Sequence, residues 1–513
     1  MVMEGSAAFL TLLVLFPLAK PGQTHRGRRN VLLIVADDAG FESPVYNNSV
    51  VHTPALQRLA SRGLTFTRAT TSVSSCSPSR SAILTGVPQH QNGMYGLHQK
   101  QHHFLSFDGV RSLPLLLSQA GVYTGIIGKK HVGPDSVYPF DFAETEENNS
   151  ILQVGRNITR IKELVQRFLG STDGRPFFLY IGFHDPHRCG HSHPELGSFC
   201  ERFGSGEPGT GSIPDWKPQH YSPSEVKVPY FVPDTPAARA DLAAQYTTIN
   251  RLDQGIGLIL DELQRAGHEG DTLVIYTSDN GIPFPTGRTN LYQQGLAEPL
   301  IVSSPRHRAR WGQRTKAMAS LLDITPTMLD WFSVPYPEYA IFHGTRPVHL
   351  TGRSLLGALT HELSWNVAFG SQSLHEITMF YPMRSIQVGN LHLIHNLHHL
   401  MPFPIDQDLF ISPTFQDLLN RSTAGEPTKW YKSLNEYYYR PPWELYDMAT
   451  DPEEKINLAG EPKWQETLQT LRLQLQNWQW DTEDPWVCGP GAVLENQGAF
   501  LHKSKCLSLH NGL

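Results

Sequence analysis

The residues best suited to chemistry in this sequence lie between Cys76 and Arg80, in the stretch Cys-Ser-Pro-Ser-Arg. Pro78 favours the first position of a helix and Gly86 the residue just past its end, so the stretch predicts a short helix with Cys76 at its N-terminus. A helix dipole stabilises negative charge at that end, and the four-residue spacing turns Arg80 toward the same face. The pattern predicts a nucleophile beside a fixed cation, although a lone cysteine at a helix start is more often simply buried.

Polar residues also follow four short apolar runs that predict buried parallel strands. The runs are residues 31–36, 122–127, 177–183 and 272–277, and the polar residues after them are Asp37, Asp38, Lys129, His131, His187, Asp279 and Asn280. In open α/β sheets, ligands bind beyond the carboxyl ends of the strands. A turn or a helix cap would explain any one of these groups equally well, but four together indicate one shared site.

The polar set contains ligands for a hard cation. The oxygens of Asp37, Asp38, Asp279 and Asn280 suit Ca²⁺ or Mg²⁺, and the set lacks the cysteines and histidines expected around zinc. A cation there would offset the charge that builds up in a transition state. The other candidate site residues are hydrogen-bond donors and proton-transfer groups: Arg80, Lys129, His131, His187 and Arg288.

Helical stretches connect the predicted strands and must position these residues. One runs over residues 54–62, and a longer one over 236–266 has Thr235 as a candidate N-cap and Gly267 at its end. From about residue 380 onward, short alternating segments predict a smaller antiparallel sheet, with a helix at 462–478 packed on it.

A chain of 513 residues is long enough for two or more domains. Residues 7–19 form an apolar run that is too short to span a bilayer, so we interpret the N-terminus as a signal peptide. We expect a signal peptide at 1–24, a catalytic α/β domain at 25–380 and a C-terminal α+β domain with an antiparallel sheet at 381–513. The adjacent acidic residues Glu453 and Glu454 are expected on the solvated surface.

The cysteines and sequons agree with a secreted chain. Five cysteines leave at least one unpaired, and local pairing of Cys189 with Cys200 and of Cys488 with Cys506 would leave Cys76 free for chemistry. Four sequons predict glycosylation: Asn47, Asn148, Asn157 and Asn420.

The net charge of the chain indicates which classes of partner it can attract. The formal charge is −6 with histidines neutral, and protonating all 24 histidines would bring it to +18. Acidic pH would therefore favour attraction to a polyanion. No later apolar run is long enough to cross a membrane, and we expect neither nucleic-acid nor membrane partners.

Several of these motifs resemble the sulfatase family, and they occur in its order. They are Asp37-Asp38, the Cys-x-Pro-x-Arg stretch, Gly128-Lys-x-His131, Asp279-Asn280-Gly281 and the C-terminal Trp443–Asp447. The resemblance implies an α/β fold of the alkaline-phosphatase-like type, in which helices flank a large mixed central sheet and a smaller C-terminal domain contains an antiparallel sheet. It also implies that a formylglycine-generating enzyme oxidises Cys76 to Cα-formylglycine. One Ca²⁺ would then be held by Asp37, Asp38, residue 76, Asp279 and Asn280.

The same resemblance implies roles for the remaining site residues. A hydroxyl of the formylglycine hydrate would attack sulfur and form a covalent sulfate intermediate, which divides one difficult displacement into two easier steps. His187 would protonate the leaving group, and His131 would serve as the base for the second step. Lys129 and Arg80 would hold the formylglycine oxygens, and Arg288 would hold the sulfate.

Two stretches, Gly93–His98 and Phe183–Cys189, resemble family members that remove the N-linked sulfate of non-reducing-end glucosamine from heparan sulfate. This resemblance implies a lysosomal enzyme, and we expect a homodimer. Alternatives are an O-sulfatase or a phosphomonoester or phosphonate hydrolase of the same superfamily. A non-catalytic heparan-binding glycoprotein is another, but it should lack catalytic residues and carry dense Lys/Arg clusters.

Overall fold

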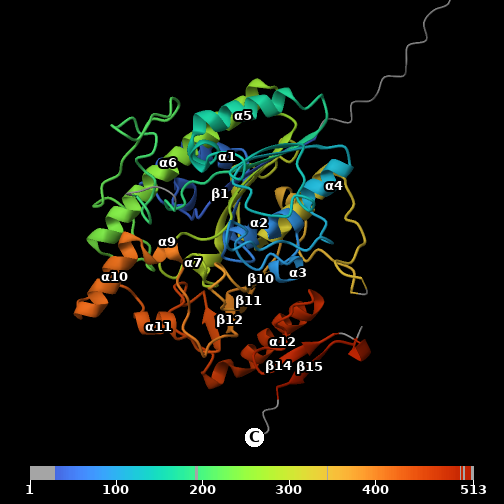
Figure 1. The fold of residues 1–513 in the computed structure, drawn as a ribbon, viewed down its shortest axis with the longest axis vertical. Helices are drawn as coiled ribbons and strands as arrows, with labels where there is room; N and C mark the ends of the chain where they lie inside the picture. Colours follow the sequence, from blue (N-terminus) through green and yellow to red (C-terminus); the bar gives the residue numbers. More distant parts are fainter. Residues whose placement is uncertain (1–28, 191–194, 344, 497, 501–502, 510–513) are drawn as a thin grey trace, which may run out of the picture.

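A nine-stranded mixed sheet forms the centre of the computed structural model, which describes residues 29–190, 195–343, 345–496, 498–500 and 503–509 (Figure 1). The predicted signal peptide at 1–24 lies outside the described residues. The strand order is β4-β3-β5-β1-β6-β7-β2-β8, and β9 pairs with β2. The strands are β1 Asn30–Ala36, β2 Leu64–Thr70, β3 Tyr123–Gly128, β4 Phe142–Thr145, β5 Phe177–Gly182, β6 Thr272–Ser278, β7 Ala297–Ser303, β8 Gln313–Thr315 and β9 Ala319–Ser320.

The four strands predicted from apolar runs are β1, β3, β5 and β6, and they lie side by side in parallel. Every residue of these strands is buried, which is why their sequences are predominantly apolar rather than alternating between apolar and polar. Their carboxyl ends therefore meet at one edge of the sheet.

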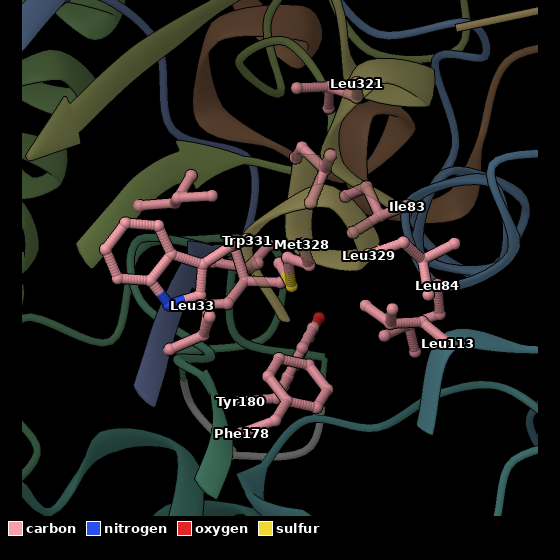
Figure 2. Close-up of a cluster of buried hydrophobic side chains, with 14 of the residues drawn as sticks. Leu33, Ile83, Leu84, Leu113, Phe178, Tyr180, Leu321, Met328, Leu329 and Trp331 are labelled. Carbon is pink, nitrogen blue, oxygen red and sulfur yellow. The ribbon is translucent and has the colours of Figure 1, made fainter. Parts of the chain in front are cut away.

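Helices cover both faces of the sheet (Figure 1). On one face pack α1 (Pro54–Ser61), α5 (Ile158–Gly170) and the long α6 (Pro236–Arg265). On the other pack α2 (Cys76–Thr85), α4 (Leu113–Gln119) and α8 (Ile324–Phe332). Figure 2 shows the core on this second face, where Trp331 and Met328 of α8 meet Leu33 and Tyr180 of the sheet.

The helix that carries the cysteine starts earlier than predicted. Ser75 is its N-cap and Cys76 its first residue, so the expectation that Pro78 occupies the first helical position is wrong; it is the third. A proline fits there because the first N–H groups of a helix have no intrahelical partner in any case. Gly86 ends the helix in the left-handed conformation, with φ 69°, as predicted.

A second, four-stranded antiparallel sheet follows, with the order β10-β11-β12-β13. Its strands are β10 Val367–Gln372, β11 Met383–Val388, β12 Leu391–Asn396 and β13 Trp443–Asp447, and α12 (Gln465–Asp481) packs on it through Leu468, Leu471, Leu475 and Trp478. The predicted mixed sheet and smaller antiparallel sheet are thus confirmed. The first strand of the smaller sheet precedes residue 381, and the division at that residue stays a prediction.

The C-terminal part also contains elements outside the smaller sheet. They are α9 (Gln407–Phe410), α10 (Pro413–Ala424), α11 (Leu434–Tyr438), and the hairpin of β14 (Ala492–Glu495) and β15 (Lys505–Ser508). Two further short α-helices are α3 (Gln89–Asn92) and α7 (Gln293–Leu296). Disulfides join Cys189 to Cys200 and Cys488 to Cys506. Within the described residues, no helix combines the length and the apolar character that crossing a bilayer would require.

Candidate active site

The acidic residues that follow β1 and β6 meet at the carboxyl edge of the large sheet. The register of these strands pairs Ala36 with Ser278, so the residues immediately after each lie side by side. The backbone N–H of Asp38 donates to Asp279 Oδ1 at 3.2 Å, and Asn280 Nδ2 donates to Asp38 Oδ1 at 2.7 Å. The structure therefore brings together all four residues that the sequence predicts as oxygen ligands.

Three buried cations surround these carboxylates. Lys129 Nζ lies 2.6 Å from Asp37 Oδ2, and Arg80 Nη2 lies 2.8 Å from Asp279 Oδ2. Arg288 Nη1 lies 3.3 Å from Asp38 Oδ2. Arg80 thus contacts the carboxylates directly, from the helix that also carries the cysteine.

Burial and mutual repulsion set the ionisation of the carboxyl groups. Burial would raise the pKa of Asp37, but Lys129 and the neighbouring cations hold it well below its usual range. Burial raises the pKa of Asp38 to about 8 despite Arg288, and that of Asp279 to about 6 despite Arg80; the adjacent carboxylates contribute to both shifts. Three carboxyl groups thus face three cations, and burial together with the proximity of the carboxyl groups to one another opposes their full ionisation. A cation bound directly to the carboxylate oxygens would stabilise the ionised form.

The same residues have oxygen atoms that make no hydrogen bond and could bind a metal ion. Asp37 Oδ1, Asp38 Oδ2 and Asn280 Oδ1 are buried without a hydrogen-bond partner. Guanidinium nitrogens of Arg80 and Arg288 lie 3.3 Å from the first two of these atoms, respectively. Asp37, Asp38, Cys76 and His187 each offer a ligand atom, and these atoms all lie within 4.8 Å of one another. Unpaired buried oxygens are costly unless something binds them, so the residues fit a divalent cation with oxygen ligands.

Cys76 faces this cluster from the N-terminus of α2. Its Sγ lies 3.5 Å from Arg288 Nη2, and it is fully buried and outside both disulfides. Burial raises the pKa of the thiol above its usual range, because a thiolate would be desolvated there. Burial therefore disfavours the nucleophilic thiolate at this position, and the conversion of Cys76 to formylglycine stays a prediction.

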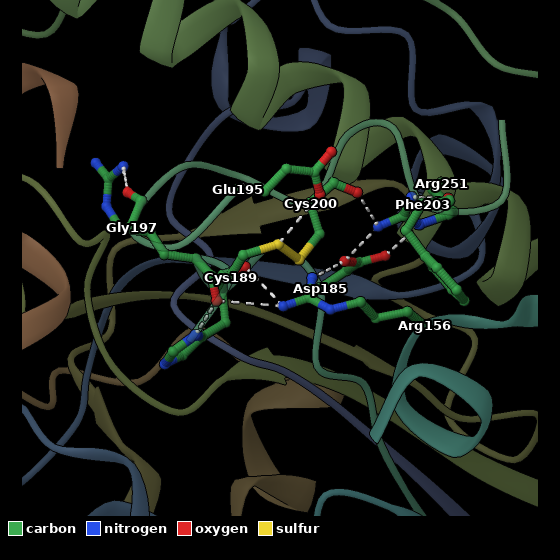
Figure 3. The surroundings of a disulfide bond; sticks show 10 residues. Arg156, Asp185, Cys189, Glu195, Gly197, Cys200, Phe203 and Arg251 are labelled. Atoms are coloured by element: carbon green, nitrogen blue, oxygen red, sulfur yellow. Dashed lines mark hydrogen bonds and ion pairs between the residues drawn. A yellow bond between two sulfur atoms is a disulfide. The ribbon is translucent and has the colours of Figure 1, made fainter. Parts of the chain in front are cut away.

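His187 stands on the segment after β5, and a buried ion-pair network fixes that segment. Asp185 accepts hydrogen bonds from Arg156 and from Arg251, whose Nε lies 2.7 Å from Asp185 Oδ2 (Figure 3). Arg156 Nη2 also donates to the carbonyl oxygen of His187 at 2.9 Å, and the backbone N–H of Asp37 donates to the carbonyl oxygen of Asp185 at 3.2 Å. Together these bonds hold His187 next to the acidic cluster, where its Nε2 lies 3.6 Å from Asp38 Oδ2.

We expect Asp185→Asn to lower the stability of the protein by about 3–5 kcal/mol, because two buried guanidinium groups would lose their counter-charge. Asp234→Asn is the matched control: Asp234 pairs with Arg239 but its side chain is 49% exposed, so the loss should stay below about 1 kcal/mol. Denaturant unfolding of both variants measures the difference. Equal stability of the two variants would contradict the anchoring role of Asp185.

His131 follows β3 and lies beside the cations of the site. Its backbone N–H donates to Glu147 Oε1 at 3.1 Å, while both ring nitrogens are buried without a hydrogen-bond partner. Burial lowers its pKa well below the usual range, and the charges of Lys129 and Arg80 lower it further. The ring is therefore held neutral, with a nitrogen available to accept a proton.

Two residues that the sequence analysis did not predict complete the site. His375 Nε2 lies 3.1 Å from Arg288 Nη2, and its Nδ1 lies 2.8 Å from the hydroxyl of Ser75. Asp408 Oδ2 lies 3.3 Å from Arg288 Nη1 and 3.6 Å from His187 Nε2. Neither belongs to a motif with chemical meaning, and both reach the site only through the packing of the C-terminal part against the large sheet.

The candidate glycosylation sites differ in accessibility. Asn47, Asn148 and Asn420 are exposed. Asn157 is only half-buried, and its side-chain oxygen accepts a hydrogen bond from the backbone of Arg160 at 3.2 Å at the start of α5. Glycan attachment at all four stays a prediction.

The sequence of this chain is similar to those of known proteins. The family model described as Sulfatase matches residues 29–334. The chain is 67% identical over 485 residues to human N-sulphoglucosamine sulphohydrolase, which covers 94% of this chain and 96% of the human protein.

Solved structures share the fold at low sequence identity. One is a protein in complex with its substrate D-glucosamine-2-N,6-O-disulfate, at TM-score 0.61 and 20% identity, covering 89% of this chain and 99% of that one. Another is the phosphonate monoester hydrolase of Agrobacterium radiobacter, at TM-score 0.55 and 19% identity, covering 87% and 96%. At such identities the likeness extends to the fold alone.

Proposed function

The chain belongs to the sulfatase family, and we propose that it removes the N-linked sulfate from glucosamine at the non-reducing end of heparan chains. The observation that carries this proposal is the 67% identity to human N-sulphoglucosamine sulphohydrolase over 94% of this chain. The site described above is compatible with it, because a buried cysteine, a ligand set for a divalent cation and two histidines converge at one sheet edge.

Two groups would complete the site. A formylglycine at residue 76 supplies a hydroxyl nucleophile for sulfur, and a divalent cation, which we propose is Ca²⁺, offsets the negative charge around it. Asp37, Asp38, Asp279, Asn280 and residue 76 would hold the cation. The fully buried thiol at the N-terminus of α2 is in accord with modification before the chain folds, by a formylglycine-generating enzyme met during biosynthesis.

The other residues would bind the substrate and move protons. Lys129 and Arg80 would orient oxygens at residue 76, and Arg288, 3.5 Å from Cys76 Sγ, would hold the sulfate. His187 Nδ1 lies 2.7 Å from the carbonyl oxygen of Arg188, which leaves Nε2 facing the site as the proton donor to the leaving nitrogen. His131, held neutral by its surroundings, would accept a proton.

Removing one cation ligand should affect activity more than folding. We expect Asp38→Asn to lower sulfate release at least about 100-fold and to reduce the bound metal, because the transition state would lose several kcal/mol of charge stabilisation. Elemental analysis should find one calcium per unaltered chain. Asp261→Asn, an exposed acidic residue paired with Arg58, is the control and should change neither quantity. Stoichiometric zinc without calcium would contradict the assignment.

The fold alone also accommodates a phosphonate or phosphomonoester hydrolase. Turnover of an aryl sulfate and a sulfamate, compared with that of an aryl phosphate by the same preparation, separates the two. We expect sulfur substrates to be hydrolysed and the phosphate not; preference for the phosphate would reject the proposal. The non-catalytic alternative is disfavoured, because every candidate catalytic residue is present and all of them are buried around one point.

We further propose a lysosomal, glycosylated homodimer with a catalytic domain at 25–380 and a C-terminal domain at 381–513. An acidic compartment suits an enzyme whose leaving group needs a proton, and two-fold assemblies are common among enzymes. A monomer mass by light scattering at micromolar concentration would reject the dimer.

A further inference from the structure

Asp408 puts a carboxylate beside the groups assigned to sulfate binding and proton donation. It belongs to α9, in the C-terminal part of the chain, and its Oδ2 lies 3.3 Å from Arg288 Nη1 and 3.6 Å from His187 Nε2. Its side chain is 22% exposed, compared with 3% for Arg288 and 9% for His187. Of these three groups, Asp408 is therefore the most accessible to an entering ligand.

The carboxylate is negatively charged and lies apart from the cation ligands. Burial would raise its pKa, but His187 and Arg288 hold the pKa below the usual range. It is not one of the four residues whose ligand atoms lie within 4.8 Å of one another. Its neighbour Asp406, in contrast, is 2% exposed and accepts the backbone N–H of Leu409 at 2.9 Å, so it caps α9.

A negative charge at this position is unfavourable for binding a sulfate, which is itself an anion. It becomes favourable if it contacts the part of the substrate that carries hydrogen. The nitrogen of a sulfamate bears one N–H, and the amine product becomes an ammonium group with three. The bridging oxygen of a sulfate ester bears no hydrogen, so its lone pairs would face those of the carboxylate and the two groups would repel each other.

We propose that Asp408 determines the specificity for nitrogen by accepting a hydrogen bond from the N–H of the sulfamate. This inference rests on the proposed function, since it assigns a partner to the leaving nitrogen. His187 Nε2 and Asp408 Oδ2 lie 3.6 Å apart. A substrate nitrogen placed to receive the proton from His187 Nε2 would therefore also lie close to Asp408 Oδ2. As the hydroxyl oxygen at residue 76 forms its bond to sulfur, the N–S bond breaks and the sulfate stays on residue 76. The electron pair of the broken bond remains on nitrogen, which takes the proton from His187. Asp408 accepts the N–H throughout, and the bond becomes charge-assisted as positive charge develops.

A purely positioning role for Asp408 makes a different prediction. If the carboxylate only oriented Arg288, its loss would weaken sulfate binding for every substrate equally, and the ratio of the two activities would not change. If it acted only through His187, its loss would lower N-sulfate turnover more than aryl sulfate turnover but would leave the binding of the amine product unchanged. If it contacts the substrate nitrogen, its loss changes both the ratio of the two activities and the binding of the amine product.

The test compares Asp408→Asn with Asp417→Asn on N-sulfoglucosamine and on an aryl sulfate. Asp417 is a matched control on α10: its side chain is 23% exposed and pairs with Arg421, away from the site. We expect Asp408→Asn to lower kcat/KM for the N-sulfate between about 10-fold and about 150-fold, the worth of a charge-assisted hydrogen bond. The aryl sulfate should lose less than about threefold, and Asp417→Asn should change neither value.

Product binding gives a second readout that does not depend on turnover. In the Cys76→Ala background, calorimetry should show that Asp408→Asn weakens glucosamine binding at least about tenfold and leaves glucose binding unchanged. Equal losses on both substrates, unchanged N-sulfate activity, or unchanged glucosamine binding would overturn the assignment. If the unaltered protein releases no sulfate from N-sulfoglucosamine, the proposed function itself fails, and the role of Asp408 fails with it.

Discussion

Replacing Cys76 with alanine should remove sulfate release, by about 10⁴-fold or more, while the protein still folds. The side chain is small and stands at the first position of α2, so its loss leaves the helix cap at Ser75 and the core below intact. The acidic cluster and its cations would remain, but no nucleophile would face them. Sulfate release and the unfolding midpoint, measured on one preparation, test both parts of this expectation.

The conversion of Cys76 to formylglycine can be detected by mass spectrometry of the unaltered protein. The peptide Ala69–Arg80, from protein made in animal cells, should carry an aldehyde in place of the thiol and should label with a hydrazide. Full activity with an unmodified thiol would contradict the role given to residue 76.

The second large effect should come from His187→Ala, and it should depend on the leaving group. An amine is a poor leaving group without a proton, so N-sulfate cleavage should fall by about 10²- to 10⁴-fold. An aryl sulfate leaves readily and should lose less than about tenfold. His52→Ala, at an exposed histidine, is the control and should change neither rate. Equal losses on both substrates would remove His187 from the role of acid.

The two histidines also predict the sign of the pH dependence. Burial lowers the pKa of His187 well below its usual range, so the protonated form that donates to nitrogen is populated only at acidic pH. Burial lowers the pKa of His131 as well, so that ring is neutral near neutral pH and able to accept a proton. N-sulfate turnover should therefore rise as the pH falls below neutrality and decline when His131 becomes protonated. An alkaline optimum would contradict these roles.

Sequence patterns predicted the parts of the molecule that local chemistry determines. The apolar runs of β1, β3, β5 and β6 are long and fully buried, and their boundaries differ from the predicted ones by one residue at most at either end. Parallel strands end at one edge of a sheet. The sequence alone therefore predicted that Asp37 and Asp279, which are separated by more than 200 positions, lie close together.

The remaining features depend on contacts between distant segments, which a local pattern does not contain. Glu454 was expected on the solvated surface, but that prediction is wrong: it is fully buried, accepts the backbone N–H of Gln293 at 2.7 Å and pairs with His392. Asp408 likewise gains its chemical role only because α9 is packed beside Arg288. In both cases a polar residue acquires its function from a partner supplied by tertiary packing.

The most direct test of the central proposal uses a heparan oligosaccharide with N-sulfoglucosamine at its non-reducing end and further N- and O-sulfates inside the chain. Purified protein with formylglycine at residue 76 is incubated with it at acidic pH, and the products are analysed by mass spectrometry. The proposed function predicts the loss of one sulfate per chain, from the terminal nitrogen, leaving a free amine there. Release of an O-sulfate, release from internal residues, or an unchanged oligosaccharide would contradict it.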